Sequence, residues 1–199
     1  TYEGESSESI LQEYARNLGF GATTGIDLPY EKSGVVPDRE LFEEWTITKP
    51  ELVRPEGWLG GDLMNLIVGQ GAITTTPMQV ANAYKTLLTG YSSVPYLDKN
   101  LEQFQKVKNF DIDEEFIEFL LNDLNLVTNK NGTAYLAFEV LGRKANDIGG
   151  KTGTAQNPGN RNNTSWFAGI DSVSNPRYVI VTVVDEGGSG SAVAAPISR

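Results

Sequence analysis

The sequence predicts an α+β fold in which helices cover an antiparallel sheet. Strand-like runs lie close together near the end of the chain, at residues 151–156, 166–171 and 178–184. Short turns at residues 157–160 and 174–176 join them, and consecutive strands joined in this way pair as an antiparallel meander. The helical patterns precede the strands and do not alternate with them, which is typical of the α+β class.

Apolar residues at helical spacing predict two helices in the first half of the chain. Ser6 or Ser7 can cap a helix that ends at Gly19. Thr76 at the N-cap followed by Pro77 at the first helical position opens another, which ends at Gly90. The segment between them is rich in glycine and proline. We expect a loop over residues 20–39 and an irregular span over residues 40–62, where Trp58 is a packing residue rather than a ligand platform.

The second half is predicted to begin with an extended linker over residues 91–110. Asp111 then caps a helix, with Glu114 at the capping-box position. A shorter helix covers residues 134–140. The last strand, rich in β-branched residues, reads as apolar on both faces, and we expect helices to cover both. A terminal helix is expected to start near Arg199.

Composition limits the function. The chain has 199 residues, of which 39% are hydrophobic and 21% charged, as in one globular domain. A net charge of −10 argues against nucleic acid or an anionic membrane surface as partner. The chain contains neither cysteine nor histidine, so we expect no zinc site of the ordinary type. No other metal and no cofactor are predicted. No apolar run approaches the length of a membrane span.

The most informative stretch is Gly149-Gly150-Lys151-Thr152-Gly153-Thr154-Ala155-Gln156. Its glycines allow close approach of a ligand or another backbone, and Lys151 brings a compact positive charge. In an extended strand the hydroxyls of Thr152 and Thr154 lie on one face, while Lys151 and Gly153 share the other. Such a strand suits an anion, especially a carboxylate, that lies along it. On its own, Lys-Thr-Gly also fits a glycine-rich turn that leads into a strand.

The order of several further motifs resembles class B penicillin-binding proteins. The motifs are Gly19-Phe20-Gly21 with Thr24-Gly25-Ile26-Asp27-Leu28-Pro29, Gly69-Gln70-Gly71 with Thr75 through Tyr84, the Lys-Thr-Gly stretch, Ser165-Trp166-Phe167-Ala168-Gly169, and Asn175-Pro176-Arg177-Tyr178. Lys-Thr-Gly is the third motif of penicillin-binding proteins and of class A β-lactamases. The resemblance covers nearly the whole chain. It implies part of the transpeptidase fold shared with serine β-lactamases.

The resemblance implies acyl transfer by a serine of a peptidoglycan D,D-transpeptidase. Its substrates would be stem peptides that end in D-Ala-D-Ala, and β-lactams would trap the acyl-enzyme. Lys151 matches the catalytic lysine that sets the local positive field. The hydroxyls of Thr152 and Thr154 match the carboxylate-binding positions, and the backbone N–H of Thr154 matches one oxyanion-hole donor. Gly153 would leave the strand clear for substrate to add as a further strand.

The chain departs from the family pattern because it contains no Ser-x-x-Lys and no Ser-x-Asn. We therefore expect residues 1–199 to be the C-terminal portion of a single transpeptidase domain, inactive alone. The nucleophile and a membrane anchor would lie upstream. The protein would act at the outer face of the bacterial membrane, where a polytopic membrane glycosyltransferase would be one of its partners. A non-catalytic binding or scaffold domain of the cell-wall machinery is the alternative. An intact Ser-x-x-Lys upstream would favour the enzyme.

Overall fold

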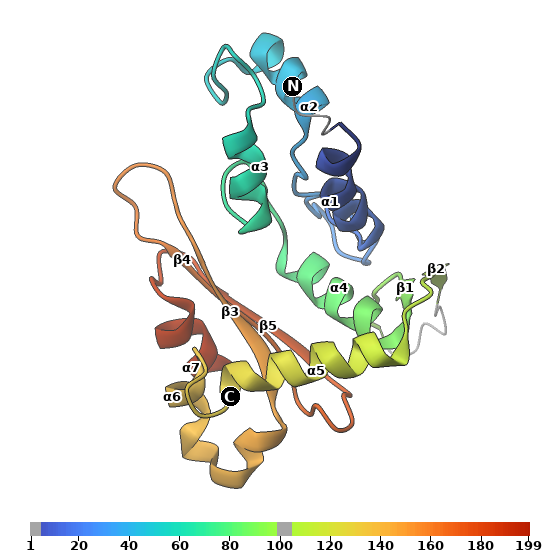
Figure 1. The fold of residues 1–199 in the computed structure, drawn as a ribbon, viewed down its shortest axis with the longest axis vertical. Coiled ribbons are helices and arrows are strands. Elements are labelled where there is room, and N and C mark those ends of the chain that lie inside the picture. The colour runs from blue at the N-terminus through green and yellow to red at the C-terminus, as the bar shows by residue number, and fades with distance from the viewer. Residues whose placement is uncertain (1–4, 99–104) are drawn as a thin grey trace. The chain divides into compact units, whose positions relative to one another are not determined.

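A computed structural model describes residues 5–98 and 105–199 of the chain (Figure 1). These residues form two compact units, the first ending at Gln79 and the second running from Val80 to Arg199. The first unit contains helices α1 (Glu5–Asn17), α2 (Arg39–Thr48) and α3 (Gly60–Ile67), and α4 (Pro77–Thr89) begins in it. The sheet and the Lys-Thr-Gly stretch lie in the second unit.

An aromatic cluster forms the core of the first unit. Phe42 and Trp45 of α2 pack with Trp58 and with Leu66 of α3, and all four are buried. The rings of Phe42 and Trp58 meet edge to face, with centroids 5.0 Å apart and an interplanar angle of 86°. Trp58 is 4% exposed, which confirms the prediction that it is a packing residue.

Gln79 joins the loops of the first unit to the start of α4. Its Nε2 donates to the carbonyl oxygens of Ala22 at 2.7 Å and Ser33 at 2.6 Å. Its Oε1 accepts from the backbone N–H of Thr76 at 2.9 Å, while its own N–H donates to Thr76 Oγ1 at 3.2 Å. This reciprocal pair is a capping box, so the predicted N-cap at Thr76 is confirmed. The Thr-Pro-Met-Gln sequence therefore has a structural role within this unit.

The prediction that residues 40–62 are irregular is wrong for α2 and for the start of α3 at Gly60. Asp38 is the N-cap of this helix, and its Oδ1 accepts from the backbone N–H of Leu41 at 2.8 Å. Arg16 forms an ion pair with the other carboxylate oxygen of Asp38. The N-cap aspartate is a recognisable start signal, but the helix is only 10 residues long and its apolar face rests on two aromatic residues.

The second unit holds the remaining elements. In chain order they are β1 (Tyr91–Ser93), β2 (Lys106–Asn109), α5 (Glu114–Thr128), α6 (Tyr135–Phe138), the 3-10 turns η1 (Glu139–Asp147), β3 (Gly149–Ala155), β4 (Thr164–Ile170), β5 (Val179–Val184), the π-helical turn η2 (Gly190–Ala194) and α7 (Ala195–Ser198).

The predicted meander is confirmed. Strands β3, β4 and β5 form a three-stranded antiparallel sheet in that order, so β3 is an edge strand among the described residues. Gly149 pairs with Ile170 at one end of β3, and Ala155 pairs with Thr164 at the other. The α+β prediction is therefore confirmed, and the sheet places the Lys-Thr-Gly stretch on its edge.

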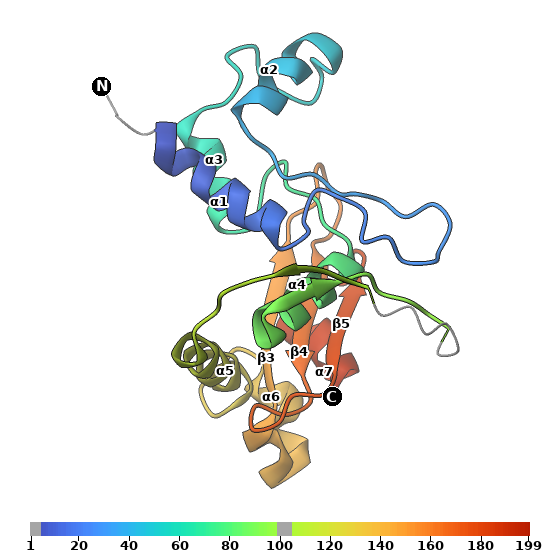
Figure 2. The same ribbon diagram turned by 90° about the vertical axis from the view of Figure 1, so that its right-hand side faces the viewer.

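Helices cover the sheet from two sides. Figure 2 shows α4 in front of the strands and α7 behind them. On the side of α7, Phe138 of α6, Phe167 of β4 and Ala194 of η2 belong to one buried cluster. Cover over β5 is less complete than the sequence predicts: its residues are mostly half-buried, and Ile180 is 42% exposed.

Two predictions for the start of the second unit are wrong. Residues 91–110 are not simply an extended linker, because β1 and β2 pair antiparallel, from Tyr91 opposite Asn109 to Ser93 opposite Lys106. Asp111 does not cap α5. The N-cap is Asp113, which makes no side-chain capping bond. Asp111 and Asp113 are two residues apart, and either carboxylate can lie next to the positive end of the helix, so the N-cap is ambiguous in sequence.

The C-terminal helical turn begins earlier than predicted, at Gly190 rather than near Arg199. Ser165 of β4 is bonded to both ends of this turn. Its Oγ donates to the carbonyl oxygen of Ser189 at 2.9 Å and accepts from the backbone N–H of Ala194 at 3.0 Å. A buried hydroxyl thus satisfies backbone groups on both sides of the turn, and a local sequence pattern cannot reveal this long-range contact.

Candidate active site on the edge strand

The Lys-Thr-Gly stretch forms most of β3, and its glycines let the strand pack closely. A Cβ on Gly150 would lie 2.3 Å from Cζ of Phe167 on the neighbouring strand. A Cβ on Gly190 would lie 2.2 Å from the carbonyl oxygen of Gly153. The centre of β3 is therefore held between β4 and the turn at η2, with no room for a side chain at either contact.

Lys151 borders a cavity of about 560 Å³ in the second unit. The other lining residues come from α4 and α5: Tyr84, Leu87, Leu88, Leu120, Asp123, Leu124, Leu126 and Val127. Burial raises the pKa of Tyr84 to about 12, so its hydroxyl is uncharged at neutral pH. Lys151 is exposed, and its Nζ donates to the carbonyl oxygen of Thr152 at 2.7 Å. Lys151 thus lies beside a cavity that is lined mainly by apolar residues.

Thr152 and Thr154 lie on the opposite pleat of β3 from Lys151. They pair across the sheet with Phe167 and Ser165, which belong to the face covered by η2 and α7. The oxygen Oγ1 of Thr154 accepts from the backbone N–H of Gly190 at 3.2 Å. The side-chain alternation predicted from the sequence is therefore correct, and this bond shows that a surface hydroxyl of the motif also ties the C-terminal turn to the strand.

All the residues predicted for the site lie side by side on β3, because they are contiguous in sequence. The structure adds residues that the sequence analysis did not single out as site neighbours. Thr133, in the loop before α6, has its Oγ1 3.0 Å from Oγ1 of Thr152. Gly190 of η2 donates to Thr154, and Tyr84 of α4 lines the same cavity as Lys151. The only sequence feature at Thr133 is that it follows a glycine in a turn, which does not indicate a place in the site.

Ser165 resembles a nucleophile only in residue type. It is fully buried, and its Oγ is occupied by the two backbone bonds to Ser189 and Ala194 described above. A nucleophilic serine needs a base within hydrogen-bond reach and an open approach to substrate. Ser165 therefore holds the C-terminal turn in place and cannot attack a carbonyl in this arrangement.

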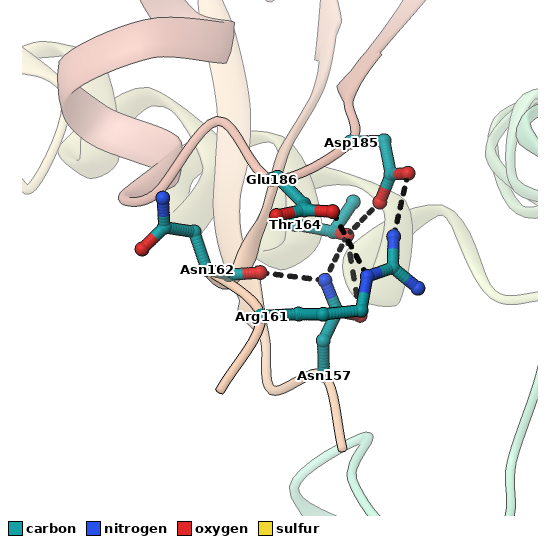
Figure 3. A network of polar contacts seen from close by, with 6 residues as sticks. All are labelled: Asn157, Arg161, Asn162, Thr164, Asp185 and Glu186. Carbon is teal, nitrogen blue, oxygen red and sulfur yellow. Dashed lines mark hydrogen bonds and ion pairs between the residues drawn. The ribbon is translucent and has the colours of Figure 1, made fainter. Parts of the chain in front are cut away.

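A polar network fixes the turn that follows β3 (Figure 3). Arg161 donates from Nη2 to Asp185 Oδ2 and from Nε to Glu186 Oε1, each at 2.9 Å. Thr164 Oγ1 donates to Asp185 Oδ1 at 2.9 Å, and Asn157 Nδ2 donates to Thr164 Oγ1 at 3.0 Å. The hydrogen bond from Thr164, with the Arg161 charge as a further cause, lowers the pKa of Asp185. The network joins both ends of the β3–β4 turn to the residues after β5.

In residues 5–98 and 105–199 no group of three or more His, Cys, Asp and Glu side chains is arranged to hold a metal ion. Over the same ranges, each helix is too short or too polar to cross a lipid bilayer.

The family model described as "Penicillin binding protein transpeptidase domain" matches residues 4–199. Among curated proteins, the peptidoglycan D,D-transpeptidase MrdA of Haemophilus influenzae is 30% identical over 214 residues. That alignment covers 95% of this chain and 31% of the relative. MrdA of Escherichia coli K12 is 29% identical over 208 residues, covering 92% of this chain and 31% of the relative. The chain thus spans about a third of the length of these relatives.

Solved structures give the same fold. Pseudomonas aeruginosa PBP2, in complex with WCK 5153, has a TM-score of 0.75 and 26% identity, covering 94% of this chain and 41% of that one. Helicobacter pylori PBP2, in complex with MreC, has a TM-score of 0.73 and 25% identity, covering 96% and 36% respectively. Helices packed on an antiparallel sheet are therefore common to this chain and to these structures.

Proposed function

This chain belongs to the family of penicillin-binding protein transpeptidase domains, and we propose that it forms part of a serine-type peptidoglycan D,D-transpeptidase. The observation that carries the proposal is the edge strand β3. On one face of this strand Lys151 lies beside the cavity, and on the other face Thr152 and Thr154 carry hydroxyls. The family model spans almost the entire chain. The MrdA relatives, which align with 95% and 92% of this chain, are named D,D-transpeptidases.

The proposed reaction has two steps. A serine Oγ, supplied by a segment outside residues 1–199, attacks the carbonyl carbon of the penultimate D-Ala. The C–N bond breaks, and the departing D-Ala amine takes the proton that the serine loses. An amine of a neighbouring stem peptide then attacks the ester, gives its proton to the serine oxygen and forms the cross-link. A β-lactam follows the first step only, since its ring amide opens without leaving.

In this proposal the residues of β3 stabilise negative charge on the substrate and on the reacting groups. Lys151 is a catalytic residue that supplies positive field toward the nucleophile. Thr152 and Thr154 bind the terminal carboxylate of the substrate, and the backbone N–H of Thr154 is one donor of the oxyanion hole. Gly153 leaves the strand clear, so the substrate adds along the edge of β3 as a further strand. A group lying along this edge is within reach of side chains on both pleats.

We further propose that both compact units are parts of one transpeptidase domain. The rest of that domain carries Ser-x-x-Lys and Ser-x-Asn, and a membrane anchor precedes it, so that the enzyme acts at the outer face of the bacterial membrane. The family model extends across both units, which supports the single-domain proposal. A polytopic membrane glycosyltransferase is a proposed partner, and an MreC-like protein is another, since Helicobacter pylori PBP2 forms a complex with MreC.

The test is the second-order rate of β-lactam acylation of the full-length protein. Thr152→Val and Thr154→Val each remove a hydroxyl and keep size and strand propensity. A hydrogen bond to a charged group contributes about 1.5–3 kcal/mol, which converts to a loss of about tenfold to a hundredfold in rate. Lys151→Ala should cost more, because it removes the cation of the motif.

Thermal unfolding of each variant is the control, and all three should fold. The backbone N–H of Thr154 survives every substitution, so acylation should slow without vanishing. If both valine variants react at the parental rate, the carboxylate is bound elsewhere and the assignment of β3 is wrong.

A further inference from the structure

Thr133 places a third hydroxyl at the proposed carboxylate site, beside that of Thr152. Its Oγ1 lies 3.0 Å from Oγ1 of Thr152, although the two residues are 19 positions apart. Thr152 is half-buried and Thr133 is exposed, so the pair lies at the surface of the second unit. The contact is a single hydrogen bond between two hydroxyls, and either oxygen can be the donor.

The loop that carries Thr133 is tightly held on both sides. The N–H of Gly132 donates to the carbonyl oxygen of Asn129, and the N–H of Ala134 donates to that of Val127, each at 2.8 Å. A Cβ on Gly132 would lie 2.1 Å from the carbonyl oxygen of Leu126 and 2.3 Å from that of Val127. Thr133 is therefore fixed between two residues that the end of α5 restrains.

Helix α5 is itself tied to the start of β3. Asn125 Nδ2 donates to the carbonyl oxygen of Ile148 at 2.9 Å, and Thr128 Oγ1 donates to the same oxygen. Ile148 directly precedes β3. One continuous set of hydrogen bonds thus fixes the helix end, the Thr133 loop and the strand relative to one another, all within the second unit.

We propose that Thr133 is a positioning residue that orients the hydroxyl of Thr152 toward a bound carboxylate. A threonine hydroxyl has one proton and two acceptor lone pairs. When Thr133 donates to Thr152, the proton of Thr152 is free to point at the anion. Hydrogen bonds in such a chain polarise one another, so the bond to the carboxylate is strengthened. This inference rests on the proposed function, in which Thr152 binds the terminal carboxylate of the substrate or β-lactam.

The experiment is a double-mutant cycle in the full-length protein. Thr133→Val, Thr133→Ser, Thr152→Val and the double valine variant are compared by second-order acylation rate with a penicillin. A hydrogen bond between neutral groups contributes about 0.5–1.5 kcal/mol, so Thr133→Val should slow acylation by about twofold to tenfold. Thr133→Ser, which keeps the hydroxyl, should stay close to the parent. The double variant should be no slower than Thr152→Val alone.

A second readout isolates the carboxylate. The same variants are tested with the methyl ester of that penicillin, which has no anionic group. The effect of Thr133→Val should disappear with the ester, whereas a general disturbance of the fold would slow both reagents.

Three results would overturn the inference while leaving the proposed function standing. In the first, Thr152→Val is slow but Thr133→Val reacts like the parent. In the second, the two valine effects add fully. In the third, Thr133→Ser is as slow as Thr133→Val. Either of the last two makes the role of Thr133 merely structural. Parental rates for both Thr152→Val and Thr154→Val would instead reject the carboxylate role of β3, and with it the inference.

Discussion

Gly150 and Gly190 set how closely β3 approaches its neighbours. At Gly150 a Cβ meets mainly the ring of Phe167, at 2.3 Å, with the carbonyl oxygen of Ala168 at 2.9 Å, whereas at Gly190 it meets the backbone of Gly153 and Trp166, at 2.2 and 2.4 Å. A ring can shift, but paired strands cannot move without loss of the sheet. The two positions therefore predict different responses to the same substitution.

We expect Gly150→Ala to lower the free energy of unfolding by about 1–3 kcal/mol, as overpacking of a closed site does. Gly190→Ala should lower it further, because the clash falls on the backbone of β3 and β4. Gly60→Ala is the control, since a Cβ there meets no atom within 4 Å. Urea unfolding of the full-length protein measures all three. Equal stability of Gly190→Ala and Gly60→Ala would contradict the close packing of η2 on β3.

For single residues, the sequence predicts how neighbours along one strand are oriented. The alternation of Lys151 against Thr152 and Thr154 follows from the period of a strand and is correct in the structure. The bond between Thr133 and Thr152 could not be predicted, because a short helix and the turns of η1 separate the two residues. The bond from Gly190 to Thr154 could not be predicted either, because β4 and β5 separate those two residues.

Among the elements, the β3–β4 turn offers a pH-dependent feature that can be tested. The hydrogen bond from Thr164, followed by the charge of Arg161, lowers the pKa of Asp185. The stabilisation from a carboxyl with a depressed pKa is present above the pKa of the unfolded chain. It is lost as the pH falls through the lower pKa of the folded state. The network should therefore weaken on the acid side and not on the alkaline side.

We predict that Thr164→Val raises the pKa of Asp185 toward the value of a free carboxyl, as measured by NMR titration of side-chain carboxylates. Asp147 is the internal control. Hydrogen bonds from Ser172 and Ser174 lower its pKa, and no group in the β3–β4 turn contributes. An unchanged Asp185 titration in the variant would show that the hydrogen bond from Thr164 is not the cause.

The elements also show where sequence patterns are strong. The three strands and α4 carry clear signals, namely β-branched runs, turn residues and the Thr-Pro start. Helices α2 and α3 and the β1–β2 pair were missed. All are short, and α2 packs into the first unit through the buried side chains of Phe42 and Trp45. Tertiary contacts determine the structure of such short segments, and these contacts cannot be inferred from a single sequence.

For the whole molecule, the sequence predicted one domain, and the structure has two compact units that a single family model spans. The chain corresponds to about a third of the length of its relatives, at 31% for the MrdA proteins. The function proposed here is therefore that of a longer protein. In that proposal, this chain supplies the edge strand with its cation and hydroxyls, and another segment supplies the serine.

The most direct test is to locate the acylated serine. The full-length protein and residues 1–199 alone are each incubated with a fluorescent penicillin, separated on denaturing gels and mapped by mass spectrometry. We predict a labelled serine in the full-length protein, within a Ser-x-x-Lys outside residues 1–199, and no covalent label on the isolated chain. A labelled serine inside residues 1–199, or a folded full-length protein that takes no label, would contradict the account.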